Sequence, residues 1–194
     1  MSSPSREHSL KEIAAYQQRL QVCVAESDFS AVADLAELLH QAWIARSRVF
    51  ICGNGGSAGN ANHLANDFLY GVNPTGKALD VESLSANSAV MTCLANDTGY
   101  DNIYAQQLVS KANAGDLLIV LSGSGNSGNI VAALEQARAL QMNTAAIVGY
   151  SGGKAKAMSD VVIHFNYNDM QIAEDMQLVV GHMLMRDLHR RLSA

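Results

Sequence analysis

The sequence repeats one local pattern: an apolar run, a turn rich in glycine and serine, and a segment with helical spacing. "RVFICGNGGSAGNANHLANDFLY" begins at Arg48, and "DLLIVLSGSGNSGNIVAALEQARAL" begins at Asp116. A shorter version, "NTAAIVGYSGGKAKAM", begins at Asn143, and the runs "DVESLS" and "DVVIHF" begin at Asp80 and Asp160. Strands that alternate with helices are typical of a parallel sheet covered on both faces. The pattern predicts an α/β fold with a doubly wound, Rossmann-like sheet of five parallel strands.

The two ends of the chain have the spacing of helices. Apolar residues recur at helical intervals in "LKEIAAYQQRLQVCV" and "FSAVADLAELLHQAWIA" near the N-terminus, and in "DMQIAEDMQLVVGHMLMRDLHRRL" near the C-terminus. Residues 1–46 are therefore expected to form a helical hairpin in front of an α/β core at 47–194. With only two prolines and no linker-like segment, residues 1–194 are predicted to be one domain.

The composition argues against several classes of protein. No apolar run is long enough to span a bilayer, and the first residues contain no apolar signal core. Cys23, Cys52 and Cys93 form no CxxC pair and suit small buried residues in a reducing cytoplasm, where the protein is predicted to reside. A formal net charge of -5 without a basic block disfavours direct binding to nucleic acid.

The glycine- and serine-rich turns suit an anion. In a doubly wound sheet, ligands bind beyond the carboxyl ends of the strands. Glycines let backbone amides approach an anion, hydroxyls donate hydrogen bonds, and the following helix adds the positive end of its dipole. The turns offer Asn54, Gly55, Gly56 and Ser57, and then Ser122, Ser124, Asn126 and Ser127.

Tight turns and helix caps would explain a single turn of this kind. Three hydroxyls within six residues, directly ahead of a helix, favour a phosphate site instead. Neither turn contains the Walker lysine motif or a well-placed dinucleotide fingerprint, so no nucleotide cofactor is expected.

Four polar side chains form two pairs on predicted helices. His63 and Asp67 are one turn apart, and Glu174 and His182 lie near one face of the last helix. His63 and Asp67 alone could be a surface pair of little energetic effect, and His182 could be a core histidine. Two imidazoles and two carboxylates are also a suitable set of ligands for a first-row metal, with zinc favoured by the histidines. The residues by themselves leave these alternatives open.

Several segments resemble the SIS (sugar isomerase) family: "CGNGGSAGNANHLAND", "LANDTGYDNIYAQQL", "AGDLLIVLSGSGNSGNIVAAL" and "VGYSGGKAKAMSDVVIHF". More narrowly, they are similar to bacterial phosphoheptose isomerases, which convert sedoheptulose 7-phosphate to glycero-manno-heptose 7-phosphate for the cell envelope. The resemblance runs from about Val49 to the C-terminus. It implies a homotetramer that carries zinc, one ion per subunit.

The resemblance also implies roles for particular residues. It assigns the substrate to Asn54, Gly55, Ser57, Asp97, Ser122, Ser124, Ser127 and Glu174, with the serines at the phosphate. It assigns the metal and acid/base positions to His63, Asp67, Glu174 and His182. Four positions depart from the usual family residues, namely Asp67 for glutamate, Gly71 for arginine, Gln171 for aspartate and Glu174 for glutamine. These departures leave the identity of the sugar open.

The leading hypothesis for function is the aldose–ketose isomerisation of a sugar phosphate through an enediol. Asp67 is the candidate base and His182 its partner acid/base, because the environment can tune each group toward neutrality. Two alternatives remain at this point. One is a non-catalytic SIS protein that associates with the replication initiator, and the other is a sensor that binds a phosphosugar without turnover.

Overall fold

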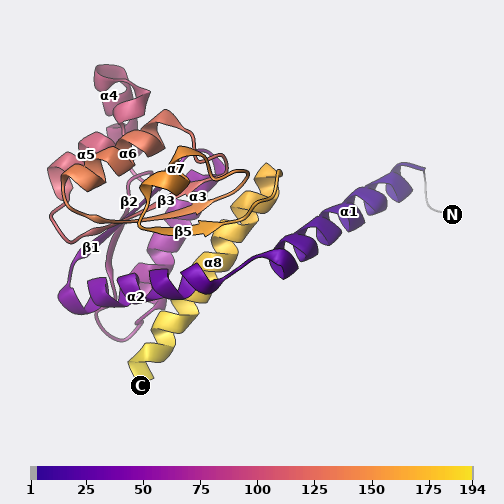
Figure 1. The fold of residues 1–194 in the computed structure, drawn as a ribbon, viewed down its shortest axis with the longest axis horizontal. Helices are drawn as coiled ribbons and strands as arrows, with labels where there is room; N and C mark the ends of the chain where they lie inside the picture. Colours follow the sequence, from indigo (N-terminus) through magenta and orange to yellow (C-terminus); the bar gives the residue numbers. More distant parts are fainter. Residues whose placement is uncertain (1–3, 194) are drawn as a thin grey trace.

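Five parallel strands form one sheet in the computed structural model, which describes residues 4–193 (Figure 1). The strand order is β2-β1-β3-β4-β5. The strands are β1 (Arg48–Gly53), β2 (Asp80–Ser83), β3 (Leu117–Ser122), β4 (Asn143–Val148) and β5 (Val161–His164). The predicted five-stranded parallel sheet is therefore confirmed. Residues 1–3 and 194, which belong to the predicted domain, lie outside the described residues.

Helices cover both faces of the sheet. α2 (Ser30–Ala45), α3 (Gly56–Asn66) and α8 (Met170–Arg190) pack on one face. α5 (Ala105–Lys111), α6 (Gly128–Ala139) and α7 (Gly153–Met158) pack on the other, next to α4 (Ser88–Thr98). The short turns are η1 (Asp67–Gly71), η2 (Tyr100–Asn102) and η3 (Arg191–Ser193).

The strands are buried on both faces because their apolar runs supply side chains to two cores. Successive side chains of a strand point to opposite faces. Ile119 and Ile147 therefore join the core under α2, α3 and α8, whereas Leu118 and Ala146 join the core under α5 and α6. The sequence runs are continuous rather than alternating, as expected for a sheet with helices on both sides.

The predicted N-terminal helical hairpin is not confirmed. Figure 1 shows α1 (Pro4–Glu26) extending away from the sheet, whereas α2 lies along it. α2 uses its apolar stripe, including Leu35 and Leu39, against the sheet and α8, so this stripe is not available to α1. On α1, Leu10 and Ile13 remain 48% and 55% exposed. Helical spacing predicted both helices correctly but gave no information about which helix faces which.

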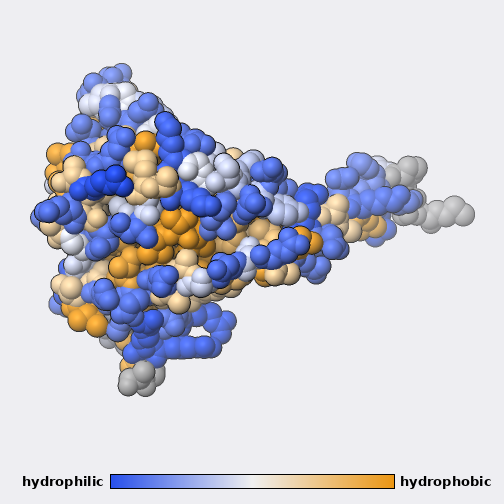
Figure 2. Space-filling model, viewed as in Figure 1, coloured by the Kyte–Doolittle hydropathy of each residue, from blue (hydrophilic) through white to orange (hydrophobic). Residues whose placement is uncertain are grey.

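The hydropathy of the surface differs between α1 and the rest of the protein, as Figure 2 shows. Hydrophobic residues gather across the middle of this face, near α2 and α8, while the projecting α1 is mainly hydrophilic. None of the helices within residues 4–193 is both long and apolar enough to cross a membrane.

Candidate functional site

A pocket of about 250 Å³ lies at the carboxyl ends of β1 and β3. These strands are neighbours in the sheet. After β1 the chain adds β2 at one edge of β1 and then crosses over to add β3 at the other edge, so the strand order reverses between β1 and β3. Ligands of doubly wound sheets bind at this switch point. The lining residues of the pocket are Asn54, Gly55, Ser57, Leu121, Ser122, Gly123, Ser124, Ser127, Met170 and Glu174. The two predicted turns therefore meet, and with them every predicted substrate-binding residue except Asp97.

Asp97 lies on α4, outside the residues that line the pocket. Its carboxylate accepts hydrogen bonds from the Asn96 amide at 2.7 Å and from the Cys93 thiol at 3.5 Å. α4 has no buried residue and projects from the body of the protein, as Figure 1 shows. The place at the sugar that the resemblance implies for Asp97 is thus not found within one chain.

The first turn is held by a network of neutral polar groups. The side-chain amides of Asn54 and Asn129 pair at 2.8 Å, and the Tyr100 hydroxyl donates to Asn54 at 3.0 Å. The Tyr104 hydroxyl donates to the carbonyl oxygen of Gly53, and burial raises the pKa of this phenol. The sequence reading missed these supporting residues, although the place of Asn129 directly after the second turn was a usable signal.

The serines of the pocket are held in place by acceptor contacts. Ser57 Oγ accepts from Gln177 Nε2 at 3.0 Å, and Ser122 Oγ accepts from the backbone N–H of Gly125 at 3.0 Å. A hydroxyl that accepts one hydrogen bond still has its own proton to donate. Both buried serines can therefore donate to an anion in the pocket. Gly125 has φ +67°, and a Cβ there would lie 2.0 Å from the carbonyl oxygen of Gly152, so glycine is required at this turn.

Glu174 has the one carboxyl group among the described residues that line the pocket. Its carboxylate lies against Gly56, the first residue of α3, where an added Cβ would be 2.2 Å from Glu174 Oε2. Asp101 has a similar position at the start of α6, where a Cβ on Gly128 would lie 2.4 Å from Asp101 Oδ1. Each helix that follows a turn thus begins on a glycine that faces a carboxylate of the same chain.

The second group of polar residues consists of His63, Asp67 and His182, called the triad below. The two Nε2 atoms are 3.0 Å apart, and Asp67 Oδ2 is 3.4 Å from His63 Nε2 and 3.6 Å from His182 Nε2. The side chains of the histidines are 47% and 49% exposed, and that of Asp67 is 17% exposed. The structure brings three of the four predicted residues together, and they meet within one chain.

The helices α3 and α8 position the triad. They run side by side in the same direction, because Gly56 faces Glu174 at one end and Leu64 faces Gly181 farther along. A Cβ at position 181 would lie 2.1 Å from Leu64 Cδ2, so glycine allows the two helices to approach closely. Asp67 opens the π-helical turn η1 directly after α3.

The triad fits a zinc ion by geometry. One ligand atom from each residue lies within 4.8 Å of the others. Tetrahedral ligands bound about 2.0–2.1 Å from zinc lie roughly 3.3 Å from one another. The observed distances of 3.0, 3.4 and 3.6 Å bracket this value. Two imidazoles and a carboxylate are also a common donor set for zinc.

Glu174, the fourth predicted metal ligand, does not join the triad within one chain. It precedes His182 by eight residues on α8, a rise of about 12 Å along the helix. The sequence spacing correctly placed both residues near one face, but one ion also requires them at the same height. Glu174 lies in the pocket instead.

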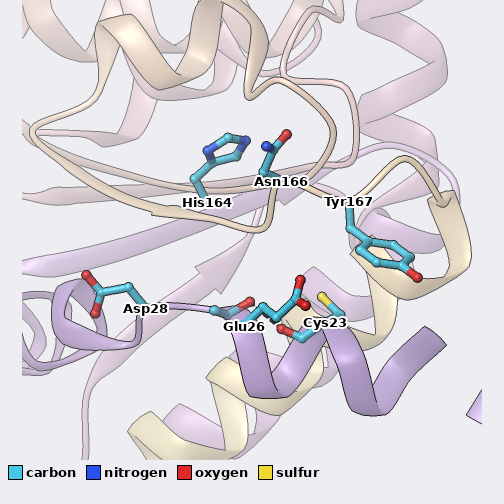
Figure 3. Close-up of a pocket in the computed structure, with 7 residues that line it drawn as sticks. Cys23, Glu26, Asp28, His164, Asn166 and Tyr167 are labelled. Carbon is cyan, nitrogen blue, oxygen red and sulfur yellow. Dashed lines mark hydrogen bonds between the residues drawn. The ribbon is translucent and has the colours of Figure 1, made fainter. Parts of the chain in front are cut away.

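Another pocket, of about 230 Å³, lies where the α1–α2 connection faces β5 (Figure 3). Cys23 and Glu26 lie at the end of α1, and His164 and Asn166 lie across from them. Both ring nitrogens of His164 have partners, Lys156 Nζ at 3.1 Å and the carbonyl oxygen of Tyr150 at 2.8 Å. These contacts explain His164 as a structural residue, as its place in a predicted strand suggests.

Comparisons with known proteins agree with this geometry. The SIS domain family matches residues 13–149. A phosphoheptose isomerase from Helicobacter pylori (strain P12) is 33% identical over 183 residues, which cover 94% of this chain and 95% of the relative. The structure of a phosphoheptose isomerase from Francisella tularensis has a TM-score of 0.88 and 26% identity, over 94% of this chain and 98% of that one. The phosphoheptose isomerase structure from Neisseria gonorrhoeae has a TM-score of 0.84 at the same identity, over 94% and 97%.

Proposed function

Because this chain belongs to the SIS domain family, among its phosphoheptose isomerases, it is an aldose–ketose isomerase of a sugar phosphate, and we propose how its residues perform the reaction. The proposed reaction converts sedoheptulose 7-phosphate to D-glycero-D-manno-heptose 7-phosphate in the cytoplasm. The observation that carries it is the position of the two glycine- and serine-rich turns, which meet in one pocket at the switch point of the sheet.

The pocket is suited to the phosphate group. Ser57, Ser122, Ser124 and Ser127 supply hydroxyl donors, and α3 and α6 both begin beside the turns. Hydroxyls and backbone N–H groups of the turns favour an anion without a lysine or an arginine. The first residues of α3 and α6 already face Glu174 and Asp101, so the turns rather than the helix dipoles carry this part of the proposal. In the proposal, Asn54 and Glu174 face the hydroxyls of the sugar.

The triad supplies the groups for proton transfer. In the proposed reaction, Asp67 takes a proton from C1 of the ketose, next to the C2 carbonyl, and an enediol forms. A proton is then returned to C2, and His182 exchanges protons with the sugar oxygens. Asp67 Oδ2 faces the two histidines, whereas Oδ1 accepts one long hydrogen bond, from Asn66 Nδ2 at 3.4 Å, and is the oxygen proposed as the base. His63, Asp67 and His182 would hold zinc through the two Nε2 atoms and Oδ2. A bound ion would polarise the carbonyl and hydroxyl oxygens of the sugar in place of proton exchange at His182 Nε2, and His182 would then hold the metal.

The distance between pocket and triad suggests that a second subunit takes part. His63 follows Gly56 by seven residues, a rise of about 10 Å along α3. An extended heptose phosphate measures about 10 Å from C1 to phosphorus, at roughly 1.2 Å per bond. A phosphate held by the serine turn, beyond the start of α3, would leave C1 short of the triad of the same chain. We therefore include in the proposal a homotetramer in which the triad of one subunit completes the pocket of another.

A turnover assay followed by NMR, with the zinc content and the molecular mass of the same sample, tests this function. The wild-type protein should convert sedoheptulose 7-phosphate, and Asp67→Ala should lose turnover by about 10³-fold or more while it still binds the sugar phosphate. Turnover by Asp67→Ala at the parent rate would refute the assignment of the base. Binding without turnover by the wild-type protein would indicate a sensor, and neither binding nor turnover would indicate a non-catalytic partner of another protein.

A further inference from the structure

Glu174 gives the pocket a negative charge of its own. The other described residues that line it are neutral, and they present amides, hydroxyls and apolar groups. The side chain of Glu174 reaches from α8 across to the first residue of α3, so that a Cβ on Gly56 would lie 2.2 Å from Oε2 and 2.5 Å from Oε1. The carboxylate thus sits where the start of α3 favours an anion.

A phosphate that enters this pocket meets like charge. Inorganic phosphate near neutral pH carries one or two negative charges and has at most two protons to donate, fewer than a sugar phosphate with its several hydroxyl groups, so less offsets its repulsion from Glu174. Repulsion between like charges is strong in a partly enclosed pocket, where water screens less than in bulk solvent. A phosphorylated sugar differs, because its hydroxyl groups can donate to the carboxylate while its phosphate stays at the serines. Carboxylates are acceptors with about four lone-pair sites.

We propose that Glu174 is a specificity residue that makes the pocket reject free inorganic phosphate and select phosphate esters of polyhydroxylated chains. The inference rests on the proposed function for the place of the sugar phosphate in this pocket. It assigns to Glu174 a role that a neutral amide of the same shape could not fill. A neutral amide would accept and donate hydrogen bonds to the sugar but would not repel a second anion.

The test measures two dissociation constants on the full-length protein by calorimetry, one for inorganic phosphate and one for sedoheptulose 7-phosphate. Glu174→Gln removes the charge and keeps the shape, and Glu174→Ala removes the acceptor as well. Glu135→Gln is the matched control, because Glu135 is an exposed carboxylate on α6, one of the helices that start at the pocket. The control variant should leave both constants unchanged.

Glu174→Gln should bind inorganic phosphate about tenfold or more tightly than the wild type, because one like charge is removed. Its affinity for the sugar phosphate should rise less than its affinity for inorganic phosphate. The neutral amide oxygen accepts weaker hydrogen bonds from the sugar hydroxyls than the carboxylate does, which offsets the relieved repulsion of the phosphate. Glu174→Ala should also gain affinity for inorganic phosphate but should lose affinity for the sugar phosphate. An unchanged or weaker affinity of Glu174→Gln for inorganic phosphate would overturn the inference.

The two proposals can fail separately. The inorganic phosphate measurement requires no turnover, so it tests the charge of Glu174 even if the protein does not isomerise sedoheptulose 7-phosphate. Conversely, an active isomerase whose Glu174→Gln variant keeps the wild-type ratio of the two dissociation constants would retain the proposed function and refute the inference.

Discussion

The two ends of the α3–α8 helix pair have opposite characters. At the start of the pair, polar groups already have partners in the same chain. The buried Gln177 donates to the buried Ser57, and the buried Asn129 pairs with the half-buried Asn54. At the other end, His63 and His182 are about half exposed and face each other with Asp67. In the proposed assembly, one chain supplies the serine-lined part of the site and leaves its own acid/base groups open to a substrate held by another subunit.

The largest change in turnover is expected when the pocket is inactivated in one chain and the triad in another. Asp67→Ala should lose turnover by about 10³-fold or more because it lacks the base. The double variant Ser124→Ala/Ser127→Ala should lose about 10²-fold or more because it lacks phosphate donors. Co-expression of the two variants should restore a large part of the activity, because some sites then combine an intact pocket with an intact triad. The assay is turnover of sedoheptulose 7-phosphate by the purified mixed assembly.

The same experiment has a built-in control. Both changes placed in one chain and co-expressed with the wild type should reduce activity without any gain from mixing. Mixed assemblies of the two separate variants that stay as inactive as their parents would show that pocket and triad work within one chain. In that case the shared site would be refuted, and the phosphate would have to bind closer to the triad of its own chain than the serine turn.

Removal of one imidazole tests the chemistry of the exposed end. His182→Ala should weaken zinc binding by more than about 100-fold, because three ligands within one chain become two. Zinc content after dialysis against a chelator measures this loss. His8→Ala, in an exposed position on α1, is the control and should keep the wild-type zinc content. Full retention of zinc by His182→Ala would show that the triad is not the zinc site.

The sequence predicted the pocket at the start of the α3–α8 pair more completely than the group of polar residues at its other end. The carboxyl ends of parallel strands share one edge, so the turns after β1 and β3 had to lie close together, and the pocket followed from strand order. The His63–Asp67 pair and His182 were also predicted to meet, and they do. Glu174 was assigned to the same ion because helical spacing specifies a face of a helix but not a height relative to its neighbours. The position of α4, and with it Asp97, depended on packing that no local pattern specifies.

A smaller effect is expected from the contact that holds the helix pair together. Gly181→Ala should lower the free energy of unfolding by about 1–3 kcal/mol, because the new methyl group meets the buried Leu64 side chain. Gly59→Ala is the matched control on α3, since a Cβ there meets nothing within 4 Å. It should stabilise the helix by about 0.5–1 kcal/mol. Thermal unfolding of both variants measures the difference, and an equal effect of the two changes would refute close packing at Gly181.

The smallest effect concerns the contact of α1 with the pocket end of α8. The Tyr16 hydroxyl donates to Asp175 at 2.5 Å, next to Glu174 in the sequence, and Arg19 pairs with Asp169 at 3.2 Å. Burial, followed by the hydrogen bond to Asp175, raises the pKa of Tyr16 from 10.0 to about 12. The folded protein therefore favours the neutral phenol, and the stability from this contact is fully present below pH 10 and is lost as the pH rises toward 12.

Tyr16→Phe should remove this part of the pH dependence. Wild-type stability, measured by denaturant unfolding at successive pH values, should fall more steeply than that of Tyr16→Phe between pH 10 and pH 12. Tyr104, whose pKa burial also raises, is present in both proteins, so its contribution cancels in the comparison. Parallel curves would mean that the phenol of Tyr16 titrates alike in the folded and unfolded chains. The attachment of α1 to α8 would then depend on Arg19 and Asp169 rather than on Tyr16.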